Sequence, residues 1–250
     1  MIDPWLILFV AVVLVLAGVV KGVIAMGLPT IGVGLLSIVM PPADAAALIL
    51  LPATLTNVAQ LLSGPRLVPL VRRFWVLAAT VTLGTLLGGV WLGGLESRLA
   101  PAILGGTLLL YGVMGLRALH FITPAAWEAW LSPVIGMASG VLTGTTGVTV
   151  MPVAPFLQSL SLDREDLIQS MGLVFTVANF ALAVALSGRG APFSDPATVM
   201  AAVATLIPAF AGMEIGRRVR RGISPAAFKT WFFAGLALLG GYMVLRMMFV

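Results

Sequence analysis

Apolar residues run along this chain in stretches that are separated by short polar breaks or by glycine and proline. About 20 apolar residues in a helix cross the hydrocarbon layer of a bilayer, which is roughly 30 Å thick. The breaks predict five helical elements in each half of the chain, and the order of longer and shorter elements is the same in both halves. These elements are expected at residues 5–26, 29–40, 44–63, 74–94, 100–119, 131–149, 151–160, 166–187, 197–216 and 226–249.

The second element of each half is too short to cross a bilayer. As a helix, residues 29–40 would rise only about 18 Å at 1.5 Å per residue. The first two elements of each half are therefore expected to form a hairpin whose second arm is re-entrant. Each hairpin turn is rich in glycine and ends in proline, in GVVKGVIAMGLP from Gly18 to Pro29 and in GVLTGTTGVTVMP from Gly140 to Pro152.

Glycine and polar residues of the first half recur in the second half at a nearly constant spacing. At a shift of 122 the matched pairs are Gly18 with Gly140, Gly22 with Gly144, Asp44 with Asp166, Thr54 with Thr176, and Asn57 with Asn179. At a shift of 123, Gly89 matches Gly212 and Gly93 matches Gly216. The pattern predicts an internal duplication, with residues 1–122 as the first membrane repeat and residues 123–250 as the second. Asp44 and Asp166, which precede the third elements, are expected to be helix N-caps.

Arginine-rich loops follow different elements in the two halves. Arg66, Arg72 and Arg73 follow the third element of the first half, whereas Arg217–Arg221 follows the fourth element of the second half. Positive loops face the cytoplasm, so equivalent helices of the two halves are expected to run in opposite directions. The sequence thus predicts an all-α, polytopic membrane protein. Its two inverted repeats would each contain a Gly-rich helical hairpin followed by three transmembrane helices, with both termini outside the cytoplasm.

Composition excludes several other classes of protein. The chain is 60% hydrophobic and only 9% charged, with a mean hydropathy of +1.11, which excludes a water-soluble fold. It has no cysteine and one histidine, so we expect no metal site and no cofactor. The net charge of +5 comes from loop arginines, so no nucleic acid partner is expected. No catalytic motif is recognisable, so an enzyme is not expected, and the first apolar stretch is expected to be retained as a helix.

The hairpin turns are the first candidate site. Glycine and proline leave backbone amides without helical partners, and the N-termini of half-helices offer partial positive charge to an anion. Close helix packing through small residues is the alternative. Lys21 lies within the first turn and has Thr143 as its counterpart. It is expected either to be a counter-charge for an anion or to extend toward the cytoplasmic face.

Amides and hydroxyls of the third elements are the second candidate site. Asn57 and Asn179 each follow a threonine by three residues, so both groups share one helix face. Buried N–H and O–H donors suit an oxyanion, although a hydrogen bond between the two repeats is the alternative. The complete set of expected substrate-binding residues is Lys21, Gly22, Gly27, Thr54, Asn57, Thr143, Gly144, Thr145, Thr146, Gly147, Thr176 and Asn179. Gln60, Gln169 and Thr149 are weaker candidates.

The paired Gly-rich, proline-terminated segments at the start of each half, together with the overall length, resemble the sulfite exporter TauE/SafE family of membrane permeases. The family usually has a denser run of glycines than this chain has at Gly22–Gly27 or at Gly144–Gly147, where threonines intrude. The resemblance implies transport of sulfite, sulfonates or related organosulfur acids across a bacterial inner membrane. A secondary transporter of a small anion is the leading hypothesis, and a passive anion channel or a membrane-embedded enzyme is the alternative. A coupling proton or sodium ion and a homodimer are left open.

Overall fold

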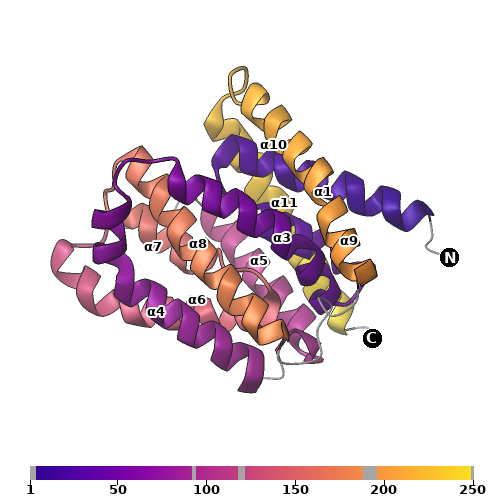
Figure 1. Ribbon diagram of the computed structural model, residues 1–250, viewed down its shortest axis with the longest axis horizontal. Coiled ribbons are helices and arrows are strands. Elements are labelled where there is room, and N and C mark those ends of the chain that lie inside the picture. The colour runs from indigo at the N-terminus through magenta and orange to yellow at the C-terminus, as the bar shows by residue number, and fades with distance from the viewer. Residues whose placement is uncertain (1–3, 92–93, 118–121, 188–195, 249–250) are drawn as a thin grey trace. The chain divides into compact units, whose positions relative to one another are not determined.

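The computed structural model describes residues 4–91, 94–117, 122–187 and 196–248 of the chain, and these residues form helices and short connections without a strand (Figure 1). The all-α prediction is confirmed. The elements are α1 Pro4–Ile24, α2 Leu28–Leu36, α3 Pro42–Leu62, α4 Leu67–Trp91, a 3-10 turn η1 Gly94–Glu96, α5 Ala100–Leu116, α6 Ala125–Thr146, α7 Val153–Ser159, α8 Arg164–Ser187, α9 Pro196–Ala204, α10 Leu206–Val219 and α11 Pro225–Met248.

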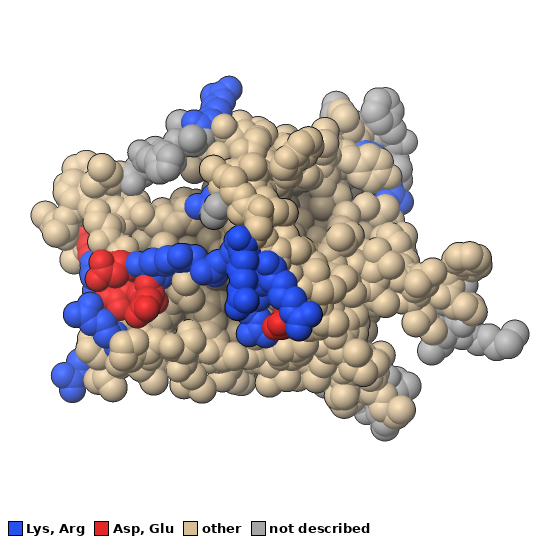
Figure 2. Space-filling view, turned by 90° about the horizontal axis from the view of Figure 1, so that it is seen from above, with Lys and Arg blue, Asp and Glu red and all other residues tan. Residues whose placement is uncertain are grey.

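Six helical segments in the described part of the chain are long and apolar enough to cross a membrane. They are Pro4–Ile24, Pro42–Leu62, Leu67–Val90, Arg164–Ser187, Val199–Val219 and Ala226–Met247. Large apolar side chains such as Trp5, Ile207 and Leu238 are exposed on these segments, as lipid contact requires. Charged side chains gather in part of the face that Figure 2 presents, and most of that face is uncharged. The chain is therefore a polytopic membrane protein.

The second arm of each hairpin is short, as expected. Helix α2 has nine residues and α7 has seven, so neither could cross the hydrocarbon layer. The first turn bends at Gly27, whose φ of 99° is left-handed, and α6 is followed by Gly147, whose φ of 74° is also left-handed. Glycine adopts this conformation at little cost, which explains why the turns contain it.

In both halves the fourth element differs from the prediction. Helix α4 begins at Leu67 instead of residue 74, so Arg72 and Arg73 lie inside a helix that is kinked at Phe74, and their expected loop position was wrong. Arginine is a good helix former, so α4 can begin before Arg72 and Arg73 and continue through them into its apolar part. In the second half, the expected element 197–216 is divided into α9 and α10 at Thr205. Pro208 has no N–H for the carbonyl four residues earlier, which weakens the helix there.

The chain forms two compact units that each combine parts of both halves. The first unit contains residues 1–52, 98–119 and 192–250, and the second unit contains residues 53–97 and 120–191. Helix α3 passes from the first unit into the second after Pro52. The predicted repeats, residues 1–122 and 123–250, were defined by matching sequence, whereas the compact units are defined by contacts. The repeats therefore stay a prediction.

In the first unit, α1 packs against α10 through paired glycines. A Cβ atom on Gly18 would lie 3.1 Å from the Cα of Gly212, and one on Gly22 would lie 3.0 Å from the Cα of Gly216. Residue numbers rise together along both helices, so α1 and α10 run parallel. The small-xxx-small spacing lets the two backbones touch, as is common between membrane helices.

In the second unit, α4 packs against α6 in the same way. A Cβ atom on Gly140 would lie 2.8 Å from the Cα of Gly84, and one on Gly144 would lie 2.9 Å from the carbonyl carbon of Gly88. These helices also run parallel. Each of the two contacts joins the first helix of one predicted repeat to the fourth element of the other, so the same packing occurs twice. Gly84 contacts Gly140 as Gly212 contacts Gly18, so the packing matches Gly84 with Gly212, and the expected match of Gly89 with Gly212 differs from it. Gly93 lies outside the described residues.

In each unit, one pair of helices that are equivalent in the predicted repeats packs side by side and antiparallel. In the first unit, α5 packs against α11 with Gly105 beside Gly240 and Gly112 beside Ala237. In the second unit, the end of α3 lies against the start of α8. Equivalent helices that lie side by side in opposite directions support the prediction of inverted repeats.

Candidate functional site

The expected site residues are divided between the two compact units. Lys21, Gly22 and Gly27 belong to the first unit, and the nine others belong to the second. Lys21 is in the last turn of α1 and is only 4% exposed. Its neighbour Gly22 lies beside Gly216, so Lys21 is near the last turn of α10. That turn contains Arg217 and Arg218, so their expected loop position was wrong, because α10 extends to Val219. Lys21 itself is buried, and its role as a counter-charge for an anion stays a prediction.

The glycines of the first turn have clear structural roles. Gly22 supports the contact of α1 with α10, and Gly27 forms the left-handed turn, where an added Cβ would lie 2.9 Å from Cγ1 of Val20. Gly144 in the second unit likewise supports the contact of α6 with α4. Close packing therefore occurs at Gly22 and Gly144, and their participation in substrate binding stays a prediction.

The threonines of the second turn bind the carbonyl groups of their own helix. Thr143 Oγ1 donates to the Ser139 carbonyl at 2.7 Å, Thr145 Oγ1 to the Val141 carbonyl at 3.0 Å, and Thr146 Oγ1 to the Leu142 carbonyl at 2.6 Å. The Thr146 hydroxyl also accepts from the amide of Val148 at 3.2 Å. Such local bonds are common for hydroxyls in apolar helices, and they occupy the O–H donors that an anion would need.

Helix α8 carries two buried donors of a different kind. Thr176 and Asn179 are 6% and 4% exposed, and they share one face of the helix. Thr176 Oγ1 and Asn179 Nδ2 have no hydrogen-bond partner within the described residues. An unsatisfied buried donor costs about 1–3 kcal/mol. These two groups are therefore the expected site residues best placed to bind a ligand.

The end of α3 is held against α8 by two glutamines. Gln169 Nε2 donates to the carbonyls of Leu61 and Gly64, both at 2.8 Å, and Gln60 Nε2 donates to the Ile168 carbonyl at 2.8 Å. Gly172 lies directly on the backbone of Leu61. The numbers run in opposite senses, so the helices are antiparallel.

Four expected site residues follow this contact along the two helices. Asn57 precedes Leu61 by four residues, and Thr176 follows Gly172 by four. Thr54 and Asn179 lie seven residues from the same contact. Residues four and seven apart share a helix face, so Asn57 and Thr54 lie on the face of α3 that carries Leu61, and Thr176 and Asn179 lie on the face of α8 that carries Gly172. That the four residues approach one another stays a prediction. We call Thr54, Asn57, Thr176 and Asn179 the α3–α8 polar group.

Two ion pairs lie at the end of the second unit where α3 finishes and α8 begins. Arg66 contacts Asp166 at 2.8 Å, and Arg73 binds both carboxylate oxygens of Glu128 at 2.7 and 2.8 Å. Asp166 lies inside the first turn of α8, and Asp44 inside the first turn of α3. The N-cap prediction for both was wrong, because each helix begins two residues earlier.

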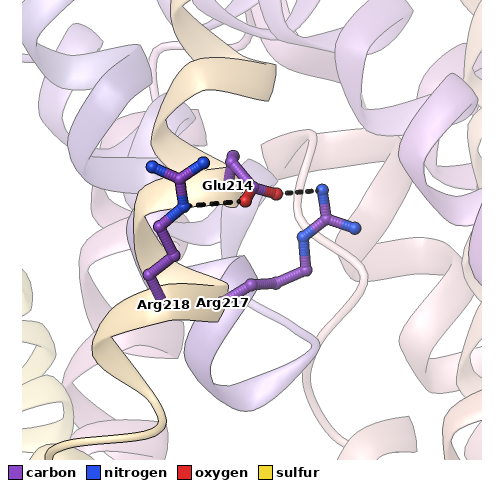
Figure 3. A network of polar contacts seen from close by, with 3 residues as sticks. All are labelled: Glu214, Arg217 and Arg218. Carbon is purple, nitrogen blue, oxygen red and sulfur yellow. Dashed lines mark hydrogen bonds and ion pairs between the residues drawn. The ribbon is translucent and has the colours of Figure 1, made fainter.

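The acidic residue of α10 is held by arginines of its own helix. Glu214 binds Arg217 and Arg218, which are three and four residues further along (Figure 3). Both ion pairs lie in the last turns of α10. They account for a carboxylate in an apolar segment without a role in proton transfer.

A family model for the sulfite exporter TauE/SafE matches residues 10–243. The chain belongs to the TauE/SafE family. No curated protein and no solved structure matches it. The matched residues include both Gly-rich turns and the whole α3–α8 polar group. TauE/SafE proteins are membrane transporters, so family membership agrees with the helical, membrane-spanning architecture.

Two buried serine hydroxyls of this TauE/SafE protein were not among the residues predicted from the sequence. Ser139 Oγ in α6 and Ser170 Oγ in α8 are buried and have no hydrogen-bond partner among the described residues. Serine is frequent at helix contacts in membranes, so neither position carries a signal in the sequence that would mark it. Both serines belong to the second unit, as the α3–α8 polar group does.

Proposed function

We propose that this TauE/SafE protein is a secondary transporter of a small sulfur-containing anion, sulfite or a sulfonate, in a bacterial inner membrane, and that the α3–α8 polar group binds the anion. The observation that supports the proposal most is the pair of buried donors, Asn179 Nδ2 and Thr176 Oγ1, without a hydrogen-bond partner in the described residues. They belong to the face of α8 that Gly172 presents to α3.

The chemistry of these donors suits an oxyanion that must be released again. Sulfite and sulfonate groups each present three oxygen atoms, which accept hydrogen bonds from amide N–H and hydroxyl O–H groups. Neutral donors compensate for part of the lost hydration without the strong hold of a buried ion pair. Binding would also remove the cost of leaving both donors unsatisfied.

Transport requires access from each side in turn. The sequence has no nucleotide-binding motif, so a concentration gradient, with or without a coupling proton or sodium ion, would drive the movement. Inverted repeats provide alternating access when one repeat rocks against the other. A family of transporters also gives no support to a catalytic role, and a purely enzymatic function is not proposed.

Orientation follows from the arginines. The Arg217–Arg221 cluster at the end of α10 and Arg66 and Arg73 beside the start of α8 and α6 are assigned to the cytoplasmic side. This topology requires α1 to run parallel to α10 and α4 parallel to α6, and both pairs do so within their own units. Both termini would then lie outside the cytoplasm.

Uptake into proteoliposomes tests the proposal. Labelled sulfite, sulfoacetate and taurine would be offered to the wild type, Asn179→Ala, Thr176→Val and Lys21→Ala. Asn179→Ala is expected to lower uptake of the transported anion at least about tenfold, because a hydrogen bond to a charged ligand contributes about 1.5–3 kcal/mol. Thr82→Val is the matched control, since Thr82 Oγ1 donates to the Ala78 carbonyl of its own helix. Unchanged uptake in Asn179→Ala and Thr176→Val, with an active wild type, would remove the site assignment.

A further inference from the structure

A pocket of about 390 Å³ lies in the first unit, where α2 and α11 end and α5 begins. At roughly 30 Å³ for each water molecule, it has room for an organic anion of several carbon atoms. Its wall is formed by the segment Ser37–Pro42, by Pro101 and by the last turns of α11 with Tyr242, Met243, Arg246 and Met247. None of these residues belongs to the α3–α8 polar group, which lies in the second unit.

Arg246 gives the pocket a positively charged wall. Its Nη1 donates to the Ile38 carbonyl at 3.0 Å, which fixes the side chain against the end of α2. A guanidinium group has five N–H donors, and its fork matches the oxygen atoms of a carboxylate or sulfonate. One donor is used by Ile38, so others are available to a ligand. Ser37 Oγ, in the same wall, is a buried hydroxyl without a hydrogen-bond partner in the described residues.

The position of Arg246 has no explanation in membrane topology. It lies about 30 Å along α11 from Pro225, at 1.5 Å per residue. The Arg217–Arg221 cluster precedes the other end of this helix, so Arg246 is at the opposite membrane face. Positive charge favours the cytoplasmic side, so in the proposed orientation topology does not account for Arg246, which lies in the last turn of α11 and binds the Ile38 carbonyl.

The remaining wall is apolar. Met40, Met243 and Pro101 line the pocket with flexible or flat apolar surface beside the guanidinium group. A bare oxyanion would leave this surface in contact with water, whereas an anion with a short apolar group would cover it.

We propose that this pocket binds an organic sulfonate at the outer face, with the sulfonate on Arg246 and Ser37 and the carbon chain against Met40 and Met243. Its role as a station for the transported anion rests on the proposed transport function. Binding itself does not depend on transport, so the two can fail separately.

The test uses the full chain in nanodiscs of zwitterionic lipid, with trifluoromethanesulfonate as the probe and fluorine NMR line broadening as the readout. The Asn179→Ala background separates the pocket from the α3–α8 polar group. Arg246→Gln is expected to weaken binding about tenfold and Ser37→Ala about threefold, since each removes a donor to a charged ligand. The control is Arg98→Gln, an exposed arginine before α5 that does not line the pocket and is expected to leave binding unchanged.

Equal affinity of Arg246→Gln and its parent would overturn the proposal. Loss of the probe when phosphatidylglycerol is added to the nanodisc would also overturn it, because a lipid headgroup would then be the occupant. Should Arg246→Gln fail to fold, Arg246→Lys serves instead, because it keeps the charge. It is expected to bind the probe about threefold more weakly than the wild type, since an ammonium group lacks the planar fork of a guanidinium. Wild-type affinity for the probe in Arg246→Lys would contradict the proposal. Probe binding through Arg246 in a protein that transports neither sulfite nor a sulfonate would overturn the proposed function and uphold the pocket.

Discussion

Gly84 in α4 and Gly140 in α6 lie backbone to backbone, so that a Cβ atom on Gly140 would be 2.8 Å from the Cα of Gly84. The same relationship joins Gly18 in α1 to Gly212 in α10. Close approach at these two places fixes two parallel helix pairs, one in each compact unit. The pairs hold the hairpin helices α1 and α6, which carry the Gly-rich turns.

Substitution at this contact should be costly. Gly140→Ala is expected to lower the free energy of unfolding by about 1–3 kcal/mol, because the new methyl group overlaps backbone atoms of α4. The control is Gly241→Ala in α11, where an added Cβ meets no heavy atom of the described residues within 4 Å. Alanine favours a helix by about 1 kcal/mol over glycine, so this control should be neutral or more stable. SDS-induced unfolding in mixed micelles measures both, and equal losses would contradict the contact.

Gln169 should be more important than Gln60 for the α3–α8 contact. Its side chain binds the carbonyls of Leu61 and Gly64 and accepts from the amide of Arg66, whereas Gln60 binds the Ile168 carbonyl. Gln169→Leu is expected to cost about 2–4 kcal/mol and Gln60→Leu about 1–2 kcal/mol, in proportion to the groups left unpaired. The same unfolding measurement decides the order, and a larger loss for Gln60→Leu would show that the glutamine contacts are assigned incorrectly.

Thr205 is expected to be coupled to Pro52. Pro52 has no N–H for the Leu48 carbonyl of α3, and Thr205 Oγ1 lies 3.2 Å from that oxygen while also reaching the Ala202 carbonyl. Thr205→Val should cost about 0.5–1 kcal/mol in the wild type. The loss should be smaller in a Pro52→Ala background, where the helix supplies its own amide. A double-mutant cycle of unfolding free energies measures this coupling, and strictly additive losses would exclude it.

Inverted topology can be tested by labelling, because the chain has no native cysteine. Ser63→Cys after α3 and Gly222→Cys after α10 are expected to react with a membrane-impermeant maleimide from the same side, and Ser97→Cys from the other. Both loops next to the arginines would then face the cytoplasm. Labelling of positions 63 and 222 from different sides would exclude the proposed orientation of the repeats.

Much of the architecture could be predicted because membrane insertion imposes a strong pattern. Helix α8 was expected at 166–187 and extends over Arg164–Ser187, and α11 was expected at 226–249 and is described over Pro225–Met248. Helix ends at the membrane surface were predicted less accurately. Helix α6 begins at Ala125 instead of residue 131, because its first turns carry Glu128 and two tryptophans, which a hydropathy pattern assigns to a loop.

The partners of the glycines could not be predicted. A small-xxx-small spacing shows that a helix can approach another closely, but it does not specify which helix. Only the packing reveals that Gly140 meets Gly84 and that Gly18 meets Gly212. The candidate site was partly recognisable, since the repeated Thr and Asn spacing led to Thr176 and Asn179. Ser37 and Arg246 lie far apart in sequence and became neighbours in one pocket only in the fold.

Counterflow of sulfite tests transport by a carrier most directly. Proteoliposomes loaded with unlabelled sulfite would be diluted into labelled sulfite at low concentration. A carrier that binds the anion at the α3–α8 polar group should accumulate label transiently above its outside concentration, and Asn179→Ala should abolish this overshoot. Label that only equilibrates through the wild-type protein would indicate a passive channel, and a wild type that moves no sulfite or sulfonate would contradict the proposed function.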